Sequence, residues 1–205
     1  MKQRLHPIEL TLMIVAILAL TSGAVALHTQ SQLAEKVVRL HVLANSDSEE
    51  DQAQKLRVRD AVLQKVGALT ADCRNAAEAR ACIRTHLPEI VRAAQDVLDR
   101  EQSPYRAEAF LREEDFETRY YETFTLPAGV YPTLRVNIGR AQGHNWWCVV
   151  FPSLCTAATA DTVAQCAEAG GYDTAQTALI TGGEEEYELR FKTLEWLEKI
   201  RSWFR

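Results

Sequence analysis

The hydrophobic pattern first predicts a strand. Residues 37–44 alternate apolar and polar side chains, which places Leu40, Val42 and Ala44 on one face and His41 on the other.

A helix is expected directly after this strand. The polar run Asn45-Ser46-Asp47-Ser48 ends the strand, and either Ser48 with Asp51 or Ser46 with Glu49 can cap a helix start. The acidic residues 49–51 suit the first turn, where the helix dipole favours negative charge. The helix should run to about Leu69, with Leu56, Leu63 and Val66 on its apolar stripe.

A second helical region covers residues 76–101, where apolar side chains recur every three or four positions. Pro88 lies inside it, so we predict a break or a new helix start between Thr85 and Pro88. A final amphipathic helix is predicted at the C-terminus, from the spacing of Leu194, Leu197, Ile200 and Phe204.

The middle of the chain returns to a period of two. Residues 109–126 predict β structure with its aromatic side chains on one face, namely Phe110, Phe116, Tyr120 and Phe124. After a turn at 127–129, the alternation of Leu134, Val136 and Ile138 with Thr133, Arg135 and Asn137 predicts a half-buried strand.

Gly139 to Gly143 form the next predicted turn. Residues 146–151 are apolar on both faces, which is typical of a central strand covered on each side. Residues 153–183 have the weakest pattern, for which we expect loops with one short helix, and Glu186 to Phe191 predict a short strand.

Together these elements predict an α/β fold of the α+β type, with a single mixed or mostly antiparallel sheet and packed helices. Residues 37–205 are expected to form a single extracytoplasmic domain, poorly patterned at 153–183.

An export segment is predicted at residues 1–27. Lys2, Arg4 and His6 precede an uncharged apolar run from Leu10 to Leu27. As a helix this run would measure about 27 Å, close to the roughly 30 Å of a bilayer core, so a retained anchor that contacts the membrane through residues 10–27 fits. Ala24-Val25-Ala26 has the small-x-small pattern of a cleavage site, so a cleaved signal peptide fits as well. In both cases the residues from about 28 onward lie outside the cytoplasm.

The charge distribution argues against nucleic acid as a partner. The formal net charge is −5 and the basic residues are scattered, without a cluster that could follow a phosphate backbone. The acidic stretch from Glu113 to Glu117 is explained by a solvated strand edge or hairpin tip.

Five cysteines in an exported chain permit disulfides and leave an odd thiol. Cys73 with Cys82 is one candidate pair, although these two and Cys166 are better explained as small apolar residues of a packed interior. The alternatives for Cys148 and Cys155 stay open, because a disulfide between them needs a turn at Pro152.

No familiar catalytic motif occurs in the sequence. Cys148 with an imidazole would be the one nucleophile arrangement, but His144 lies roughly 13 Å away along an extended strand, so a partner such as His41 on a neighbouring strand would be needed. The histidines and cysteines also lack zinc-ligand spacing. We predict no catalytic residue, no metal site and no cofactor.

The run Gly143-His144-Asn145-Trp146-Trp147 admits two interpretations. In one, Gly143 and Asn145 make the turn and the tryptophans fill the core. In the other, His144 and one tryptophan are exposed and anchor a partner. Turn geometry alone does not require a histidine and two tryptophans.

Three segments closely resemble the stage II sporulation protein R family of endospore-forming bacteria. They are Arg39 to Ser48, Glu50 to Val62, and Gly143 to Pro152 with Leu154 and Cys155, and the similarity extends from about Arg39 to Cys155. Ser153 stands where a second proline is frequent in the family, and residues 156–183 match no family feature.

The resemblance implies an exported signal protein made in the forespore. It would act in the space between forespore and mother cell, secreted or membrane-anchored, and activate a membrane-embedded aspartic protease of the mother cell that processes the sigma-E precursor. It implies no catalytic residue, so the candidate partner-binding residues are our own inference: His144, Asn145, Trp146 and Trp147, followed by Asn45, Ser46, Asp47 and Asp51. The alternative is an extracytoplasmic cysteine-dependent hydrolase centred on Cys148.

Overall fold

The computed structural model describes residues 31–154 and 160–181, together with Ile8, Thr11, Met13, Ile17 and Thr21. The chain divides into two units, one of residues 33–182 and one of residues 1–32 and 183–205. The predicted strand at 186–191 and helix at 194–204 lie outside the described residues, as does most of the predicted export segment. None of the helices described is long and apolar enough to cross a membrane.

A four-stranded mixed sheet organises the unit of residues 33–182, with the strand order β2-β5-β1-β6. β1 (Val38–Leu43) pairs in parallel with β5 (Gly129–Ile138) and antiparallel with β6 (Asn145–Phe151). β2 (Ala107–Phe116) pairs antiparallel with β5. The predicted α+β class with one mixed sheet is therefore confirmed.

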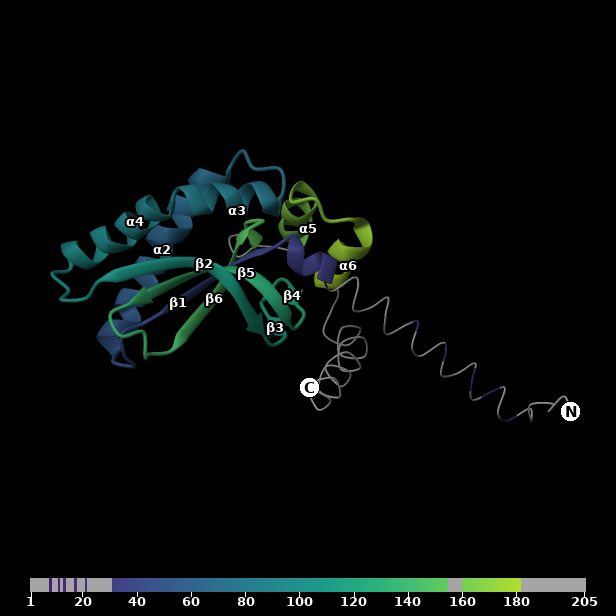
Figure 1. Ribbon diagram of the computed structural model, residues 1–205, viewed down its shortest axis with the longest axis horizontal. Helices are drawn as coiled ribbons and strands as arrows, with labels where there is room; N and C mark the ends of the chain where they lie inside the picture. The colour runs from purple at the N-terminus through teal and green to yellow at the C-terminus, as the bar shows by residue number, and fades with distance from the viewer. Residues whose placement is uncertain are drawn as a thin grey trace, which may run out of the picture. The chain divides into compact units, whose positions relative to one another are not determined.

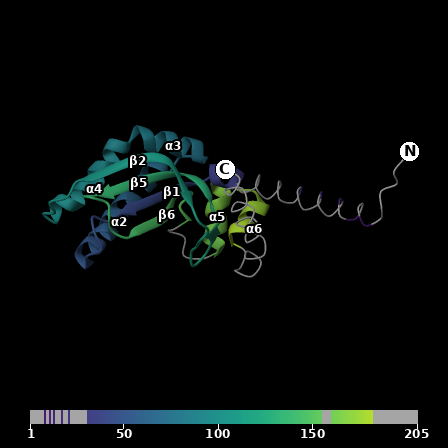
Figure 2. The same ribbon diagram turned by 60° about the horizontal axis from the view of Figure 1, so that its bottom comes forward.

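Three helices cover one face of this sheet (Figures 1 and 2). α2 (Glu49–Thr70) follows β1, and α3 (Ala76–Thr85) and α4 (Leu87–Arg100) come next. Ser48 is the N-cap of α2 and accepts a hydrogen bond from the Asp51 amide at 3.2 Å, which confirms one of the two predicted caps. The predicted break between Thr85 and Pro88 is also confirmed, since a new helix starts at Leu87.

The apolar stripe of α2 differs from the predicted one. Val66 is buried as expected, but Leu56 is exposed and Leu63 is half-buried, whereas Val58 and Val62 have no exposed surface. The buried stripe therefore follows the valines at 58, 62 and 66, which join the core, and the two leucines lie beside this stripe.

The helix-side core consists of the side chains of all four strands that face these helices. Its members include Val38, Leu40, Val42, Leu134, Val136, Ile138, Cys148 and Val150, packed against Val58, Val62, Ile83, Ile90 and Leu98. A second core lies on the other face, toward one end of the sheet, and contains Leu33, Val37, Phe116, Phe124, Leu126, Tyr131, Val149, Leu154, Val163, Tyr172 and Ile180.

Two short helices and a small hairpin enclose this second core (Figure 1). The helices are α5 (Ala160–Ala169) and α6 (Thr174–Thr181), and the hairpin pairs β3 (Arg119–Tyr120) with β4 (Thr125–Leu126). We predicted one short helix between residues 153 and 183, and two are present. Both helices are rich in alanine and threonine, so apolar and polar positions contrast little and the sequence pattern is weak.

One prediction for the β region is wrong, and the predicted aromatic face is covered only in part. Phe116 and Phe124 are buried, but Phe110 and Tyr120 are 44% and 54% exposed, because neither is covered by α5, α6 or the hairpin core. β6 lies at the edge of the described sheet and not at its centre. Its C-terminal half is nevertheless buried on both faces, since Cys148 and Val150 join the helix-side core and Val149 joins the second core.

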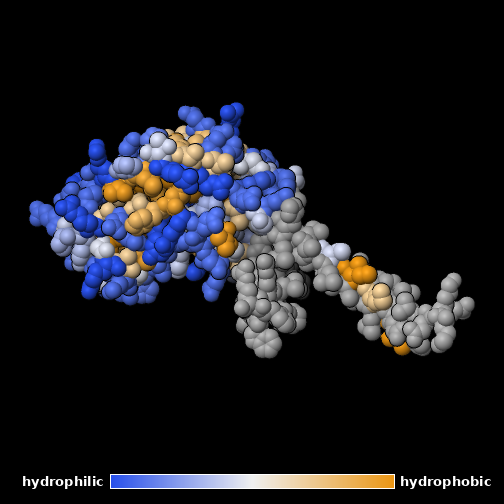
Figure 3. Space-filling view, in the orientation of Figure 1, coloured by the Kyte–Doolittle hydropathy of each residue, from blue (hydrophilic) through white to orange (hydrophobic). Residues whose placement is uncertain are grey.

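The face of the molecule turned to the viewer in Figure 3 is mainly hydrophilic, with apolar residues showing in an irregular patch near its middle. The large apolar side chains with the most exposure in the unit of residues 33–182 are Tyr120, Val130, Phe110, Trp146 and Leu56. Trp146 is the member of this group that belongs to the predicted partner-binding residues.

Candidate functional site

The connection from β5 to β6 crosses the end of another strand. β1 lies between β5 and β6, so residues 139–144 must pass over the C-terminal end of β1, where the chain leaves for α2. The Gly143 amide donates to the Ala44 carbonyl at 3.0 Å, and the Gln142 amide donates to the Asn45 carbonyl at 3.3 Å. The two groups of candidate residues, far apart in the sequence, therefore form one site.

Two glycines allow the close approach of these segments. A Cβ atom at Gly143 would lie 2.1 Å from the Ser46 carbonyl oxygen. Gly139 has a φ of +58°, and a Cβ atom there would lie 2.5 Å from Asn45 Oδ1. Both positions need glycine, the first because of space and the second because of backbone conformation as well.

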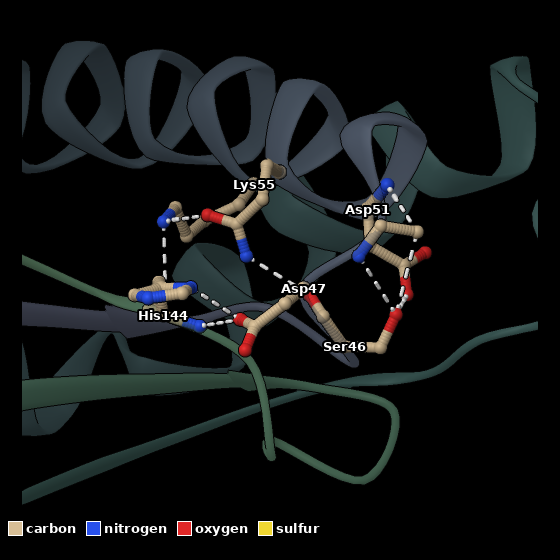
Figure 4. A network of polar contacts seen from close by, with 7 residues as sticks. Ser46, Asp47, Asp51, Lys55 and His144 are labelled. Carbon is tan, nitrogen blue, oxygen red and sulfur yellow. Dashed lines mark hydrogen bonds and ion pairs between the residues drawn. The ribbon is translucent and has the colours of Figure 1, made fainter.

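Asp47 and His144 meet at the centre of the crossing (Figure 4). One carboxylate oxygen of Asp47 accepts a hydrogen bond from the His144 amide at 2.5 Å and lies 2.5 Å from Nδ1 of the same residue. The Asp47 side chain is 57% exposed and the His144 side chain is 77% exposed. With Asn145 and Trp146, which are also exposed, they form what we call the crossing surface.

Lys55 contacts the crossing surface from α2. Its Nζ donates to the His144 carbonyl at 2.9 Å and to Gln52 Oε1 at 2.5 Å, and the Gln52 amide group donates to the Ser46 carbonyl at 2.9 Å. Lys55 is almost fully buried, and this burial lowers the pKa of its ammonium group. Figure 4 shows Lys55 reaching from α2 toward His144.

Asn45 and Asp51 lie inside the loop and not on its surface. Asn45 donates from Nδ2 to Asp51 Oδ2 at 2.9 Å and accepts from the Arg140 amide at 3.1 Å, and Ser46 Oγ donates to the same Asp51 oxygen at 2.5 Å. Burial alone would raise the pKa of Asp51, but hydrogen bonds from Ser46 and Asn45 outweigh it and lower that pKa. These three predicted site residues thus hold the loop in shape, whereas Asp47 and His144 are presented to solvent.

Asn145 connects the crossing surface to the sheet face opposite the helices. Its Oδ1 lies 2.7 Å from Nε2 of His41, and Nδ1 of His41 lies 2.6 Å from the Glu114 carboxylate. Arg112 and Arg135 contact the other oxygen of Glu114 at 2.7 and 3.2 Å. Burial alone would raise the pKa of Glu114, but His41 and the two arginines outweigh it and lower that pKa.

The two tryptophans lie on opposite faces of β6, as strand alternation predicts. Trp146 is 37% exposed, and the guanidinium of Arg59 lies 4.4 Å from its ring centre. Trp147 is half-buried between the imidazole of His41, stacked at 5.6 Å, and the guanidinium of Arg119 at 3.9 Å. Neither tryptophan is fully buried: Trp147 packs against the second core, whereas Trp146 is partly exposed, and a role of Trp146 as a partner anchor stays a prediction.

The geometry does not assemble the Cys148 nucleophile site. Leu40 lies opposite Cys148 and His41 opposite Trp147, so the imidazole and the Cys148 sulfur project from opposite faces of the sheet. Cys148 is also disulfide-bonded, and in that form it offers no thiolate. Cys155 lies outside the described residues, so its pairing with Cys148 stays a prediction.

The other cysteines and the histidines form no metal centre within the described residues. Cys73, Cys82 and Cys166 are free and half-buried. No group of three or more potential ligands in residues 31–154 and 160–181 could hold a metal ion.

Sequence reasoning missed Lys55 as a member of the site. The signal that could have found it is its position four residues after Asp51 and three after Gln52, on the side of α2 that faces the crossing. Glu114 was also missed. It lies in an acidic stretch, which usually forms a solvated strand edge. Its contact with His41 depends on the order of the strands in the sheet.

A comparison with known protein families identifies the chain. The family model for stage II sporulation protein R matches residues 34–161, which include the whole crossing surface and its supports. The chain belongs to this family. Among curated proteins, stage II sporulation protein R of Bacillus subtilis strain 168 is 37% identical over 121 residues, which is 59% of this chain and 54% of the relative. The chain thus spans about half the length of that relative, and no solved structure matches it.

Membership of the stage II sporulation protein R family implies a role in sporulation. The name carried by the relative is that of a sporulation protein.

Proposed function

We propose that this protein is an exported sporulation signal that activates, by protein binding, a membrane-embedded aspartic protease of the mother cell. The protease would then process the sigma-E precursor. The observation that carries the proposal is the crossing surface, where the exposed pair Asp47 and His144 joins two segments that both resemble the family.

The chemistry of this surface suits recognition. An aspartate, a histidine and an asparagine offer hydrogen-bonding groups beside a partly exposed tryptophan, a residue type enriched among those that contribute most to protein binding. Several buried contacts fix their positions, among them the Lys55 bond to the His144 carbonyl and the His41 contact with Asn145. A surface held in this way loses little conformational entropy when a partner binds.

The Ser46 hydroxyl, which neighbours Asp47 in the sequence, donates to Asp51 at 2.5 Å and accepts a hydrogen bond from the Ser48 amide at 3.3 Å. Its proton is therefore engaged by the Asp51 carboxylate, and the His144 imidazole contacts Asp47 through Nδ1. This arrangement favours a binding surface over a hydrolase.

The site of action belongs to the same proposal. The apolar run at residues 10–27 would export the protein from the forespore to the intermembrane space, where it is either secreted or anchored. Deletion of residues 2–26 should then retain the protein in the forespore and abolish signalling. Full activity of a verified cytoplasmic form would contradict this part.

The proposal is tested by reconstitution in a non-sporulating bacterium. The chain, the candidate protease and the sigma precursor are expressed in all combinations, and precursor cleavage is followed by immunoblot. We expect cleavage when the protease and this chain are both present, and none when either is left out. Cleavage by the protease alone, or no cleavage with all three at verified levels, would overturn the proposed activation.

A Cys148→Ser variant separates binding from cysteine-dependent hydrolysis in the same system. A binding role predicts that activation persists as long as the variant is exported and folded. Loss of activation in a variant with unchanged secretion and folding would favour the hydrolase.

A further inference from the structure

Two free cysteines lie together where α2 ends and α3 packs against it. Cys73 is in the turn that follows α2, and Cys82 is in the C-terminal half of α3. The Cys82 Sγ donates a hydrogen bond to the Leu69 carbonyl at 3.1 Å. Leu69 is in the last turn of α2, and a helical carbonyl points along the helix axis toward the residue four positions later, which here is Cys73. The Cys82 sulfur is therefore next to Cys73.

A direct contact between the two thiols agrees with this placement. Burial raises the pKa of the Cys73 thiol, and the neighbouring Cys82, which makes a side-chain hydrogen bond with Cys73, raises this pKa further. Two cysteine side chains in hydrogen-bond contact point toward each other, as a disulfide requires. The contact thus brings together the two groups that a disulfide would join.

His86 holds the Cys82 side of the pair in place. Its Nδ1 lies 2.8 Å from the Cys82 carbonyl oxygen and 3.6 Å from the Cys82 Sγ. Because a carbonyl oxygen can only accept, Nδ1 carries the proton of the neutral imidazole and is the donor in this contact. The Cys82 sulfur therefore has two fixed polar neighbours, the Leu69 carbonyl and the His86 ring. Both cysteines are half-buried, so part of each is accessible to a reagent in solution.

We propose that Cys73 and Cys82 form a disulfide that joins the end of α2 to α3 when the chain meets an external disulfide. One cysteine attacks, as the thiolate, a sulfur of the external disulfide, so that a mixed disulfide forms and one thiolate leaves. The other cysteine loses its proton to water and displaces the second thiolate. Two thiols of the chain are thereby oxidised, and one external disulfide is reduced to two thiols.

Two properties of the chain suit this modification. Cys148 is disulfide-bonded, so the fold already contains a bond that persists in oxidising surroundings. A bond between Cys73 and Cys82 would close a short loop of the unfolded chain, and the lost chain entropy would stabilise the folded state. The pair shares no residue with the crossing surface, so its test does not depend on the proposed function.

Peptide mapping of the purified full-length chain detects the bond. The probe is a buffer of oxidised and reduced glutathione in varied ratio, after which the remaining free thiols are alkylated. Trypsin cleaves after Arg74 and Arg80, so a disulfide leaves peptides 66–74 and 81–84 linked in the mass spectrum, and reduction separates them. Thermal denaturation of the same samples gives the Tm.

Three variants accompany the parent. Cys73→Ser and Cys82→Ser each remove one partner of the bond. Cys166→Ser is the matched control, since Cys166 is also free and half-buried but belongs to α5. All three variants keep Cys148, so a change in Tm that they share with the parent is assigned to the Cys148 disulfide.

Oxidised glutathione should link peptides 66–74 and 81–84 in the folded parent. The oxidised-to-reduced ratio needed should be roughly tenfold or more below the ratio needed in urea, because the fold holds the thiols together. The Tm should rise by roughly 5–10 °C. Cys166→Ser should keep both effects. Cys73→Ser and Cys82→Ser should lose both and carry glutathione on the remaining thiol of the pair.

Two results would overturn the pair. One is a folded parent in which the linked peptides do not form, whether the thiols stay free or carry glutathione. The other is a linked parent whose Tm is equal to or below that of the reduced parent, which would show that the fold does not accommodate the bond. The peptide map reads the bond directly, so it decides the first point even if a serine variant does not fold.

Discussion

A single carboxylate oxygen of Asp47 makes two contacts with His144, which lies 97 residues later in the chain. This oxygen accepts a hydrogen bond from the His144 backbone amide and also contacts Nδ1 of the imidazole. The contact exists because the β5–β6 connection passes over the end of β1. It brings the two family-like segments together at an exposed position.

We predict that Asp47→Asn and His144→Ala weaken signalling far more than they weaken the fold. Exposed substitutions and surface ion pairs usually change the free energy of unfolding by less than about 1 kcal/mol. If the pair contacts the partner, precursor processing should fall by about tenfold or more. Urea denaturation and the reconstituted processing assay measure the two effects.

Arg84→Ala is the control for this pair, since Arg84 is an exposed residue of α3 with no part in the crossing. It should leave both stability and signalling unchanged. Normal processing by both Asp47→Asn and His144→Ala would place the partner surface elsewhere.

Gly143→Ala and Gly67→Ala should have opposite effects on stability. The added Cβ at Gly143 would clash with the Ser46 carbonyl, so we expect a loss of more than about 1 kcal/mol. At Gly67, inside α2, nothing lies within 4 Å of the added Cβ, and alanine should stabilise the helix by about 0.5–1 kcal/mol. Chemical denaturation of both variants checks this; a Gly143→Ala protein as stable as the parent would show that the crossing is looser than described.

Glu114 should contribute stability that depends on pH. Because its pKa is lowered in the folded state, the contribution is present above the ordinary carboxyl value of 4.5 and is lost as pH falls through the folded value. Glu114→Gln should cost about 1–3 kcal/mol at pH 7, since glutamine offers His41 and two arginines one acceptor oxygen in place of two and no negative charge.

The measurement is the free energy of unfolding of the parent and of Glu114→Gln from pH 7 to pH 3. The difference between the two proteins should shrink below pH 4.5. Glu113→Gln, at the neighbouring exposed position, is the control and should show little difference at any pH. A constant difference across this range for Glu114→Gln would rule out the ionised carboxylate as the cause.

The two tryptophans should separate stability from binding. Trp147→Ala removes a half-buried ring between His41 and Arg119 and should cost about 3 kcal/mol, at the low end for a buried tryptophan. Trp146→Ala removes a partly exposed ring that contacts Arg59, and about 1 kcal/mol is expected. Thermal denaturation should therefore rank Trp147→Ala as the less stable variant; the reverse order would contradict the assigned positions.

Local features of the fold could be predicted from the sequence. The alternation around Leu40 and Val42 predicted β1, and Ser48 with Asp51 predicted the start of α2, because these signals depend on neighbours in the chain. The exposure of Phe110 and the edge position of β6 could not be predicted in this way. Both depend on which strands pair and on which elements cover each face.

The candidate site shows the same division. His144 and Asn145 were candidate partner-binding residues, a role that requires exposure, and both are exposed. Their union with Asp47 was not predicted, because residues 139–143 were interpreted as a simple turn, whereas the segment crosses over β1. Lys55 and Glu114 were missed because their roles come from contacts with residues 89 and 73 positions away.

The most direct test of the central claim is photocrosslinking at the crossing surface. A photoreactive amino acid is placed at position 144 or, as the control, at position 84, and the protein is irradiated in cells that contain the membrane-embedded protease. We predict a crosslink between position 144 and the protease, and none from position 84. Efficient crosslinking from position 84 with none from position 144, in variants of equal abundance, would contradict the assignment of this surface to the partner.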